Sequence, residues 1–153
     1  MNEDVFQKAI NLIPQVRADL LRQIPFELQL EIGLQMNRTN PGDKSKNKTK
    51  ILNLRTGNLY RSFTKGNPAN ILKSTGKGVE FGSKVPYAAI HEYGGVINHP
   101  GTKNGFGKGI PIPPHTINMP ARPYLAPALK AFEEDGLEPL MIKVFAPIRA
   151  LFV

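Results

Sequence analysis

The sequence predicts an α+β fold in which N-terminal helices and a C-terminal helix pack on a small antiparallel sheet, with a long hairpin or loop projecting from it. Apolar residues recur at helical spacing near both ends of the chain, over residues 3–22 and 137–153. Between them, two short apolar runs flank a Gly-containing turn, which is typical of a β-hairpin. Residues 98–116 are rich in Gly and Pro and too long for a tight turn, so they account for the projecting arm. We expect all 153 residues to form one domain.

Two segments form the expected N-terminal helices. In residues 3–22 the apolar positions follow the helical repeat, Asn2 is placed to cap the first turn, and Pro14 either kinks or restarts the helix. Residues 26–36 are ambiguous, because apolar and polar residues alternate there as in a strand. Their residue types, however, are good helix formers, and Pro25 suits the first position of a helix. We favour a helix and keep the strand as an alternative.

The middle of the chain should contain a short helix and a hairpin. Thr56 is placed to cap a helix that presents Leu59 and Phe63 on one face. Residues 69–74 and 79–82 should then pair as antiparallel strands around the Gly-containing turn. This pairing would supply the small sheet.

Two short motifs bracket the projecting arm. Residues 86–95, Pro-Tyr-Ala-Ala-Ile-His-Glu-Tyr-Gly-Gly, should form a helix of about two turns that Pro86 begins and the glycine pair ends. Residues 119–129, Met-Pro-Ala-Arg-Pro-Tyr-Leu-Ala-Pro-Ala-Leu, should form a rigid extended strap, because each Pro restricts the residue before it, and Pro127 can begin a new helix. The two motifs therefore stand at the two roots of the arm.

Strands at residues 96–99 and 116–119 should begin and end the arm. The arm packs poorly by itself, so we expect a neighbouring subunit to order it. After the strap, a helix should end near Gly136, which suits the position after a helix C-terminus. The last segment, residues 137–153, should be a helix with Pro139 near its start and Pro147 inside it.

The formal net charge of +8 is concentrated in the middle of the chain. By segment it is about −2 for residues 1–36, about +9 for 37–85, about +3 for 86–132 and about −2 for 133–153. A basic middle between weakly acidic ends suits contact with nucleic acid or head-to-tail contact between subunits, and a solvated basic face is the plain alternative. The sequence has no long apolar run and an acidic N-terminus, so we expect neither a membrane span nor a secretory signal.

Residues 37–50 form a Lys-rich loop that we expect to be exposed and mobile, since no large apolar side chain anchors it. Its basic side chains at alternate positions are Lys44, Lys46, Lys48 and Lys50. In an extended segment they could contact phosphates as point charges that carry no sequence information. The alternative is that they are only solvated.

The sequence disfavours catalytic and metal sites. There is no Cys, which removes thiol nucleophiles and cysteine-ligated zinc. His91 and Glu92 resemble the start of a zincin helix, but Gly95 stands where the second His would be needed. Asp43 and Glu80 are the only acidic residues in the basic middle, too few for a two-metal nuclease site. We assign no catalytic, cofactor-binding or metal-ligating residue, and expect no enzymatic activity.

Four motifs follow one another over about residues 50–130. They are Leu-Asn-Leu-Arg-Thr-Gly-Asn-Leu at 52–59, Phe-Gly-Ser at 81–83, the helix motif at 86–95 and Met-Pro-Ala-Arg-Pro-Tyr-Leu at 119–125. Together they resemble the virion morphogenesis or tail-completion family of tailed phages, of the kind found in Mu-like and P2-like genomes, and more loosely the tail-completion proteins of siphophages. The sequence departs from that family before residue 50, where it lacks the usual Trp-containing segment.

The resemblance implies a structural virion protein without catalysis or cofactor, which joins head and tail as a homo-oligomeric ring around the DNA channel. We expect the ring to be six-fold, to contact other neck, connector and tail-tube proteins, and to be assembled in the host cytoplasm before it becomes part of the virion. Contact with packaged DNA would be non-specific. The alternative function is a non-specific DNA-binding accessory protein.

The two motifs at the roots of the arm supply the suspected subunit interface. Its residues are Tyr87, His91, Glu92, Tyr93, Arg122 and Tyr124. Arg122 could form a bidentate ion pair with Glu92, or with a carboxylate across a subunit boundary. The suspected phosphate contacts are the four lysines of residues 44–50.

Overall fold

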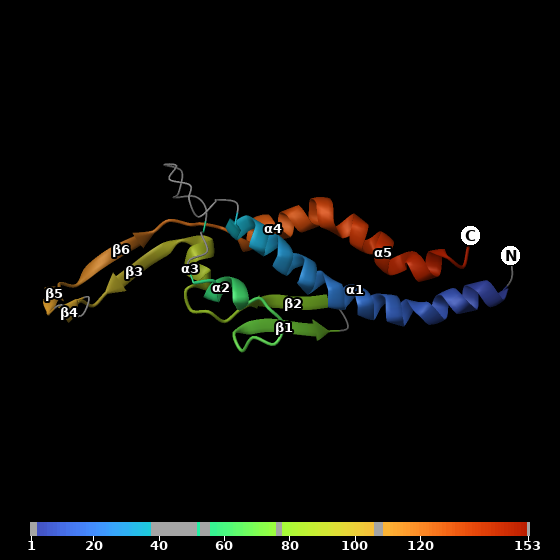
Figure 1. The fold of residues 1–153 in the computed structure, drawn as a ribbon, viewed down its shortest axis with the longest axis horizontal. Coiled ribbons are helices and arrows are strands. Elements are labelled where there is room, and N and C mark those ends of the chain that lie inside the picture. Colours follow the sequence, from blue (N-terminus) through green and yellow to red (C-terminus); the bar gives the residue numbers. More distant parts are fainter. Residues whose placement is uncertain (1–2, 38–51, 53–55, 76–77, 106–108, 153) are drawn as a thin grey trace.

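The computed structural model of the chain describes residues 3–37, 52, 56–75, 78–105 and 109–152. Figure 1 shows an α+β molecule, elongated in outline, with the ends of two long helices on one side and narrow strand pairs on the other. The predicted fold class, with helices at both ends of the chain and small antiparallel sheets, is confirmed.

A single helix, α1 (Glu3–Asn37), covers both segments expected to be helical at the N-terminus. Pro14 and Pro25 lie inside it, so the predicted division before residue 26 was wrong and the helical interpretation of residues 26–36 is correct. A proline inside a helix removes one main-chain hydrogen bond and strains the preceding turn. Packing of α1 along its length against the C-terminal helices offsets this cost.

The alternating segment of α1 has two apolar faces on opposite sides of the helix. Residues two apart in a helix are separated by about 200°, so an alternating pattern divides into two sets of residues four apart. The set that faces the core is buried: Leu28, Ile32 and Met36. The opposite set is 45–60% exposed: Phe26, Leu30 and Leu34. The alternation therefore marks a helix with an apolar face on each side, of which the fold covers one.

The short helix α2 (Asn58–Arg61) leads to the hairpin of β1 (Asn70–Thr75) and β2 (Gly78–Ser83). The hairpin is antiparallel, with Leu72 opposite Phe81, as the two apolar runs predicted. Phe81 contacts Phe63 with ring centroids 5.6 Å apart, so the hairpin packs on the core through this face.

A second antiparallel pair joins β3 (Gly95–His99) to β6 (His115–Met119), at the positions expected for the strands of the arm. Beyond it, β4 (Thr102–Gly105) pairs with β5 (Ile110–Ile112). In Figure 1 these strands extend away from the helices. We call the β3–β6 pair the ribbon.

The C-terminal helices follow one another without a loop. Helix α4 (Leu125–Ala131) continues through a π-helical turn, η1 (Phe132–Gly136), into α5 (Leu137–Arg149). The prediction that a helix ends at Gly136 was therefore wrong. Pro139 has no N–H to donate to the carbonyl of Asp135, four residues earlier, and the wide turn just before it accommodates this missing bond.

The core consists of two clusters of buried side chains along α1. One gathers α1, α2, α3 (Ala88–Tyr93) and the start of α4: Ile32, Met36, Leu59, Phe63, Ala88, Tyr124 and Ala128. The other gathers α1, η1 and α5: Val16, Leu28, Phe132, Leu140 and Val144. Phe81 packs against both, so the hairpin links them. Among the described residues, none between 94 and 123 belongs to either cluster.

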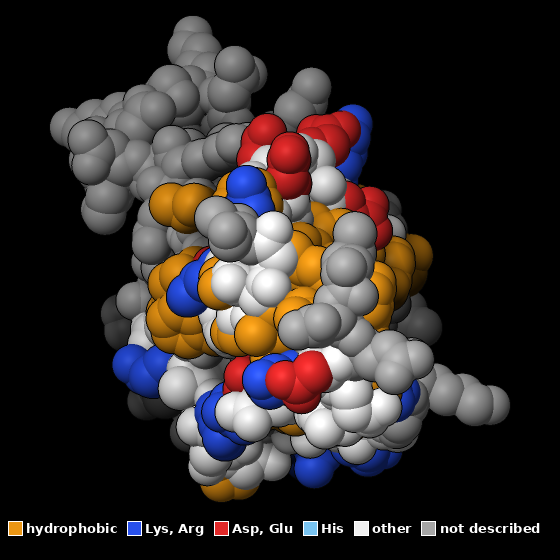
Figure 2. Space-filling model, turned by 90° about the vertical axis from the view of Figure 1, so that its right-hand side faces the viewer, with side chains coloured by type: hydrophobic (Ala, Val, Ile, Leu, Met, Phe, Trp, Pro, Cys, Tyr) orange, Lys and Arg blue, Asp and Glu red, His pale blue; other side chains and the backbone are white. Residues whose placement is uncertain are grey.

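Figure 2 views the end of the molecule where α1 begins and α5 ends. Hydrophobic side chains form a broad patch there, with acidic and basic side chains both above and below it. At this end the rings of Phe6 and Phe152 meet edge to face, 5.8 Å apart, yet both remain about half exposed.

Candidate functional site

The two sequence motifs at the roots of the ribbon contact each other directly. The N–H of Arg122 in the strap donates a hydrogen bond to the carbonyl of His91 in α3 at 2.7 Å. Gly94, which ends α3 with a φ of +70°, lies so close to the strap that a Cβ there would be 2.8 Å from the N of Ala121 and 2.9 Å from the O of Met119. Only a glycine allows this approach and this dihedral. Gly94 of the first motif is thus required by the second.

Glu92 fastens the joint between α3 and α4. Its side chain is buried, and Oε2 accepts the main-chain N–H groups of Tyr124 and Leu125, each at 2.9 Å. Oε1 accepts the N–H of Ala126 at 2.9 Å. These three amides stand at the start of α4, where N–H groups have no partner inside the helix and the helix dipole favours a negative charge. Glu92 therefore caps α4 from a helix more than thirty residues earlier in the chain.

Tyr124 anchors the strap in the core. Its ring is buried and meets Phe63 edge to face at 5.9 Å, and its hydroxyl donates to the carbonyl of Ala88 at 3.4 Å. Burial, followed by the charges of Glu92 and Tyr93, raises the pKa of Tyr124 to about 12. The strap is thus attached to α3 by polar bonds and to the core by an aromatic ring.

His91 lies beside this joint. Its ring meets that of Tyr87 edge to face at 5.8 Å. Burial, and secondly the Arg122 guanidinium, lower the pKa of His91 from 6.5, so the neutral imidazole is favoured. Its Nδ1 atom is buried and has no hydrogen-bond partner among the described residues.

The structure brings all six suspected interface residues to α3 and the strap. Two of them, Glu92 and Tyr124, are buried and make their contacts within the chain. Tyr87 and Tyr93 are exposed, by 41% and 79%. The carboxylate of Glu92 accepts three main-chain N–H groups, while contact of the six with another subunit stays a prediction. The four suspected phosphate contacts, at residues 44–50, lie outside the described residues.

The sequence identified Glu92 as a candidate residue but did not predict that it caps α4. The groups that it binds are main-chain amides, which every residue type except Pro has, so they leave no pattern in a sequence. Sequence reasoning also missed the exposed face of α1, although the alternation over residues 26–36 was the signal for it. Alternation is ordinarily evidence for a strand. In a helix the same pattern predicts apolar faces on both sides.

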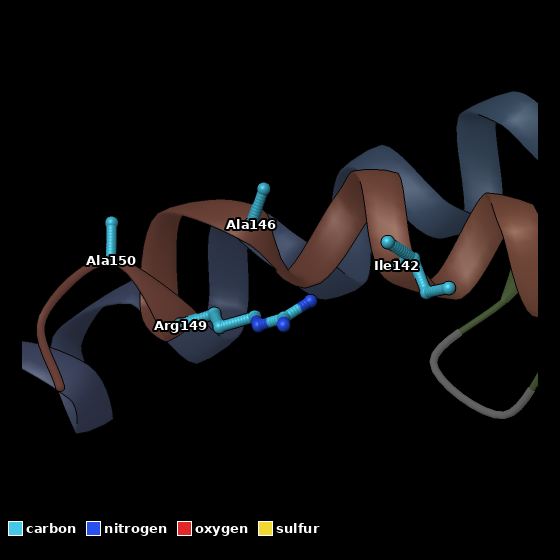
Figure 3. A pocket seen from close by; sticks show the side chains of 4 residues that line it. All are labelled: Ile142, Ala146, Arg149 and Ala150. Atoms are coloured by element: carbon cyan, nitrogen blue, oxygen red, sulfur yellow. The ribbon is translucent and has the colours of Figure 1, made fainter. Parts of the chain in front are cut away.

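The described residues contain no group of three or more metal-ligating side chains that could hold an ion. A shallow hollow on α5 is lined by Ile142, Ala146, Arg149 and Ala150 (Figure 3). In that view Arg149 lies along the helix while Ala146 and Ala150 point away from it. This lining offers an apolar surface beside one fixed positive charge and supplies neither a nucleophile nor a general base.

The sequence model of the phage virion morphogenesis family matches residues 33–139. The chain belongs to this family. The match begins in the last turn of α1, includes α3, the ribbon and the strap, and ends in the first turn of α5. Comparison with curated proteins and with solved structures gave no match. None of the described helices has the length and hydrophobicity needed to cross a bilayer.

Proposed function

We propose that this phage virion morphogenesis protein forms a homo-oligomeric ring at the junction of head and tail, around the DNA channel, and completes the tail for joining. Its work would be structural, with no catalytic step and no cofactor. Its partners would be further copies of itself and the neck, connector and tail-tube proteins on either side.

The observation that carries the proposal is that the ribbon extends from the core and is held at its base by contacts with α3 and α4. The ribbon adds nothing to the two core clusters, yet Glu92, Gly94 and Tyr124 hold its base firmly against α3 and α4. A segment that lies outside the core clusters but is held in a fixed direction at its base is suited to contact another molecule. A contact between unlike surfaces of identical chains generates a closed ring when the rotation closes.

The test is a phage in which the gene for this chain is interrupted. We expect full heads and separate tails in electron micrographs, because assembly would stop before they join. Supplying the intact chain should restore infectious particles, and the ring should appear as extra density at the junction. Joined particles of normal infectivity without the chain would overturn the proposal.

A second candidate, a non-specific DNA-binding accessory protein, is favoured by the charge of about +9 over residues 37–85. Duplex affinity measured against salt concentration tests it. Replacing the four lysines of residues 44–50 by Ala should reduce the slope of log affinity against log salt by up to about 3.6, which is about 0.9 for each phosphate that a lysine no longer neutralises. An unchanged slope would rule out this role for the loop.

A further inference from the structure

The ribbon is amphipathic, as its strand register shows. Residues directly opposite each other in an antiparallel pair point to the same side, and successive residues alternate between the two sides. One side carries the pairs Ile97–Ile117 and His99–His115, with Met119 opposite Gly95. The imidazole rings of His99 and His115 stack there, 4.9 Å apart. The other side carries Asn98, Thr116 and Asn118, with Val96 as its one apolar side chain. We call these two sides the apolar face and the polar face of the ribbon.

The chain itself leaves the apolar face of the ribbon without a core to join. Neither core cluster includes a described residue of β3 or β6. In Figure 1 the ribbon runs away from α1 and α5.

The exposed face of α1, formed by Phe26, Leu30 and Leu34, is a second apolar surface, which neither core cluster of the described residues includes. Its two ends are about 12 Å apart, at 1.5 Å for each residue of helix. The five residues of β3 span about 13 Å, at 3.3 Å for each step along a strand. The two surfaces therefore match in length as well as in apolar character.

We propose that the apolar face of the ribbon docks on the exposed face of α1 in a second copy of this chain. The inference rests on the proposed ring and names its subunit contact. Because the two surfaces differ, the contact is heterologous, as the neighbours in a ring require.

Charge favours the ribbon, rather than the α1 face of another copy, as the partner of the exposed face of α1. Residues 95–119 contain Lys103 and Lys108 and no Asp or Glu. Beside the exposed face of α1 lie Glu27 and Glu31, and residues 23–37 contain no Lys or Arg. Two α1 faces packed antiparallel would bring glutamates against glutamates. The ribbon itself carries no acidic side chain, and Lys103 in β4 brings a positive charge just beyond its end.

Single-cysteine variants can test the contact because the chain has no Cys of its own. Leu30→Cys marks the exposed face of α1, and Ile97→Cys marks the apolar face of the ribbon. Asn98→Cys is the matched control, one residue away on the polar face. Each variant is purified in full length, its circular dichroism is compared with that of the parent chain, and a short bismaleimide is added to each variant alone and to pairwise mixtures.

We expect several-fold more covalent dimer in the mixture of Leu30→Cys with Ile97→Cys than in either variant alone or in the mixture with Asn98→Cys. Dimer from Leu30→Cys alone at the same level would show that two α1 faces meet, and would overturn the inference. Equal dimer with Asn98→Cys would also overturn it. Oligomers that sediment normally while no mixture cross-links would refute this contact and leave the ring standing, whereas head–tail joining without the chain would refute the proposed function even if the cross-link forms.

Discussion

Glu92 Oε2 accepts the main-chain N–H of Tyr124 at 2.9 Å, which ties the root of the ribbon to the core. Tyr124 is itself buried against Phe63, so the bond connects α3 to the same cluster that α1 and α2 form. Besides the close approach of Gly94 to the strap, the direction of the ribbon therefore depends on two residues, Glu92 and Tyr124. Changes at these two residues should affect both the stability of the fold and any contact that the ribbon makes.

Replacing Glu92 with Ala should lower the free energy of unfolding by about 3 kcal/mol, because three amides at the start of α4 would lose their acceptor inside the protein. Urea denaturation at neutral pH measures the loss. The control is Glu80→Ala, whose carboxylate makes an exposed ion pair with Lys73 at 3.2 Å and should cost less than about 1 kcal/mol. Equal losses in the two variants would contradict the capping role of Glu92.

Gly94→Ala should be severely destabilising, by about 3 kcal/mol, because the new Cβ meets main-chain atoms of the strap that cannot move independently and the positive φ is strained for Ala. Gly66 is a matched control: its φ is +87°, but a Cβ there meets nothing within 4 Å. Gly66→Ala should therefore show the cost of the dihedral alone, about 1 kcal/mol. Similar midpoints in urea for both variants would show that α3 and the strap are not tightly apposed.

Residues 70–83 and the two strands of the ribbon could be predicted from sequence because alternation and turn residues report directly on local hydrogen bonding. The continuous α1 could not, because the local penalty of Pro25 is offset by tertiary packing that no local pattern records. For the same reason Gly136, a good helix end in isolation, lies inside a helical path.

The candidate site was predicted in position but not in mechanism. Proline and glycine spacing located the two motifs, since both residues constrain the backbone in ways that can be read locally. The pairing of Glu92 with the start of α4 depends on how α3 meets the strap in three dimensions, so no local pattern in the sequence indicates it. The family's sequence match includes both motifs.

Tyr124→Ala should lower the free energy of unfolding by about 3 kcal/mol, because it leaves a cavity beside Phe63 in the larger core cluster. Tyr93→Ala removes the same group from an exposed position of α3 and should change stability by less than about 0.5 kcal/mol. Thermal unfolding of the two variants makes the comparison. A smaller loss for Tyr124→Ala than for Tyr93→Ala would contradict the buried position of the strap.

The raised pKa of Tyr124 predicts alkaline instability. With a pKa of about 12 in the fold against 10.0 ordinarily, the unfolded chain loses this proton first. The contribution of Tyr124 to the free energy of unfolding is therefore fully present below pH 10 and is lost as the pH rises towards 12. Tyr124→Phe keeps the ring and removes the proton, so its stability should fall less over this window. An identical decline in the parent chain and Tyr124→Phe would contradict the assignment.

The lowered pKa of His91 predicts that the stability of the fold depends on pH in the mildly acidic range. Because its pKa in the fold lies below 6.5, the unfolded chain binds a proton more readily and stability falls as the pH drops below 6.5. His91→Gln should show a smaller fall in thermal midpoint between about pH 7.5 and about pH 5, since it has no group to titrate there. An equal fall in thermal midpoint for His91→Gln and the parent chain would contradict this role of His91.

The two causes of the lowered pKa of His91 can be separated at Arg122. Arg122→Gln removes the positive charge but leaves His91 buried, so the pKa should rise and still remain below 6.5, because burial is the larger cause. Titration of the His91 ring protons by NMR, compared between the parent chain and the variant, measures the shift. A pKa that does not move would show that the guanidinium points away from His91, and a pKa that reaches its ordinary value would show that charge, rather than burial, controls this imidazole.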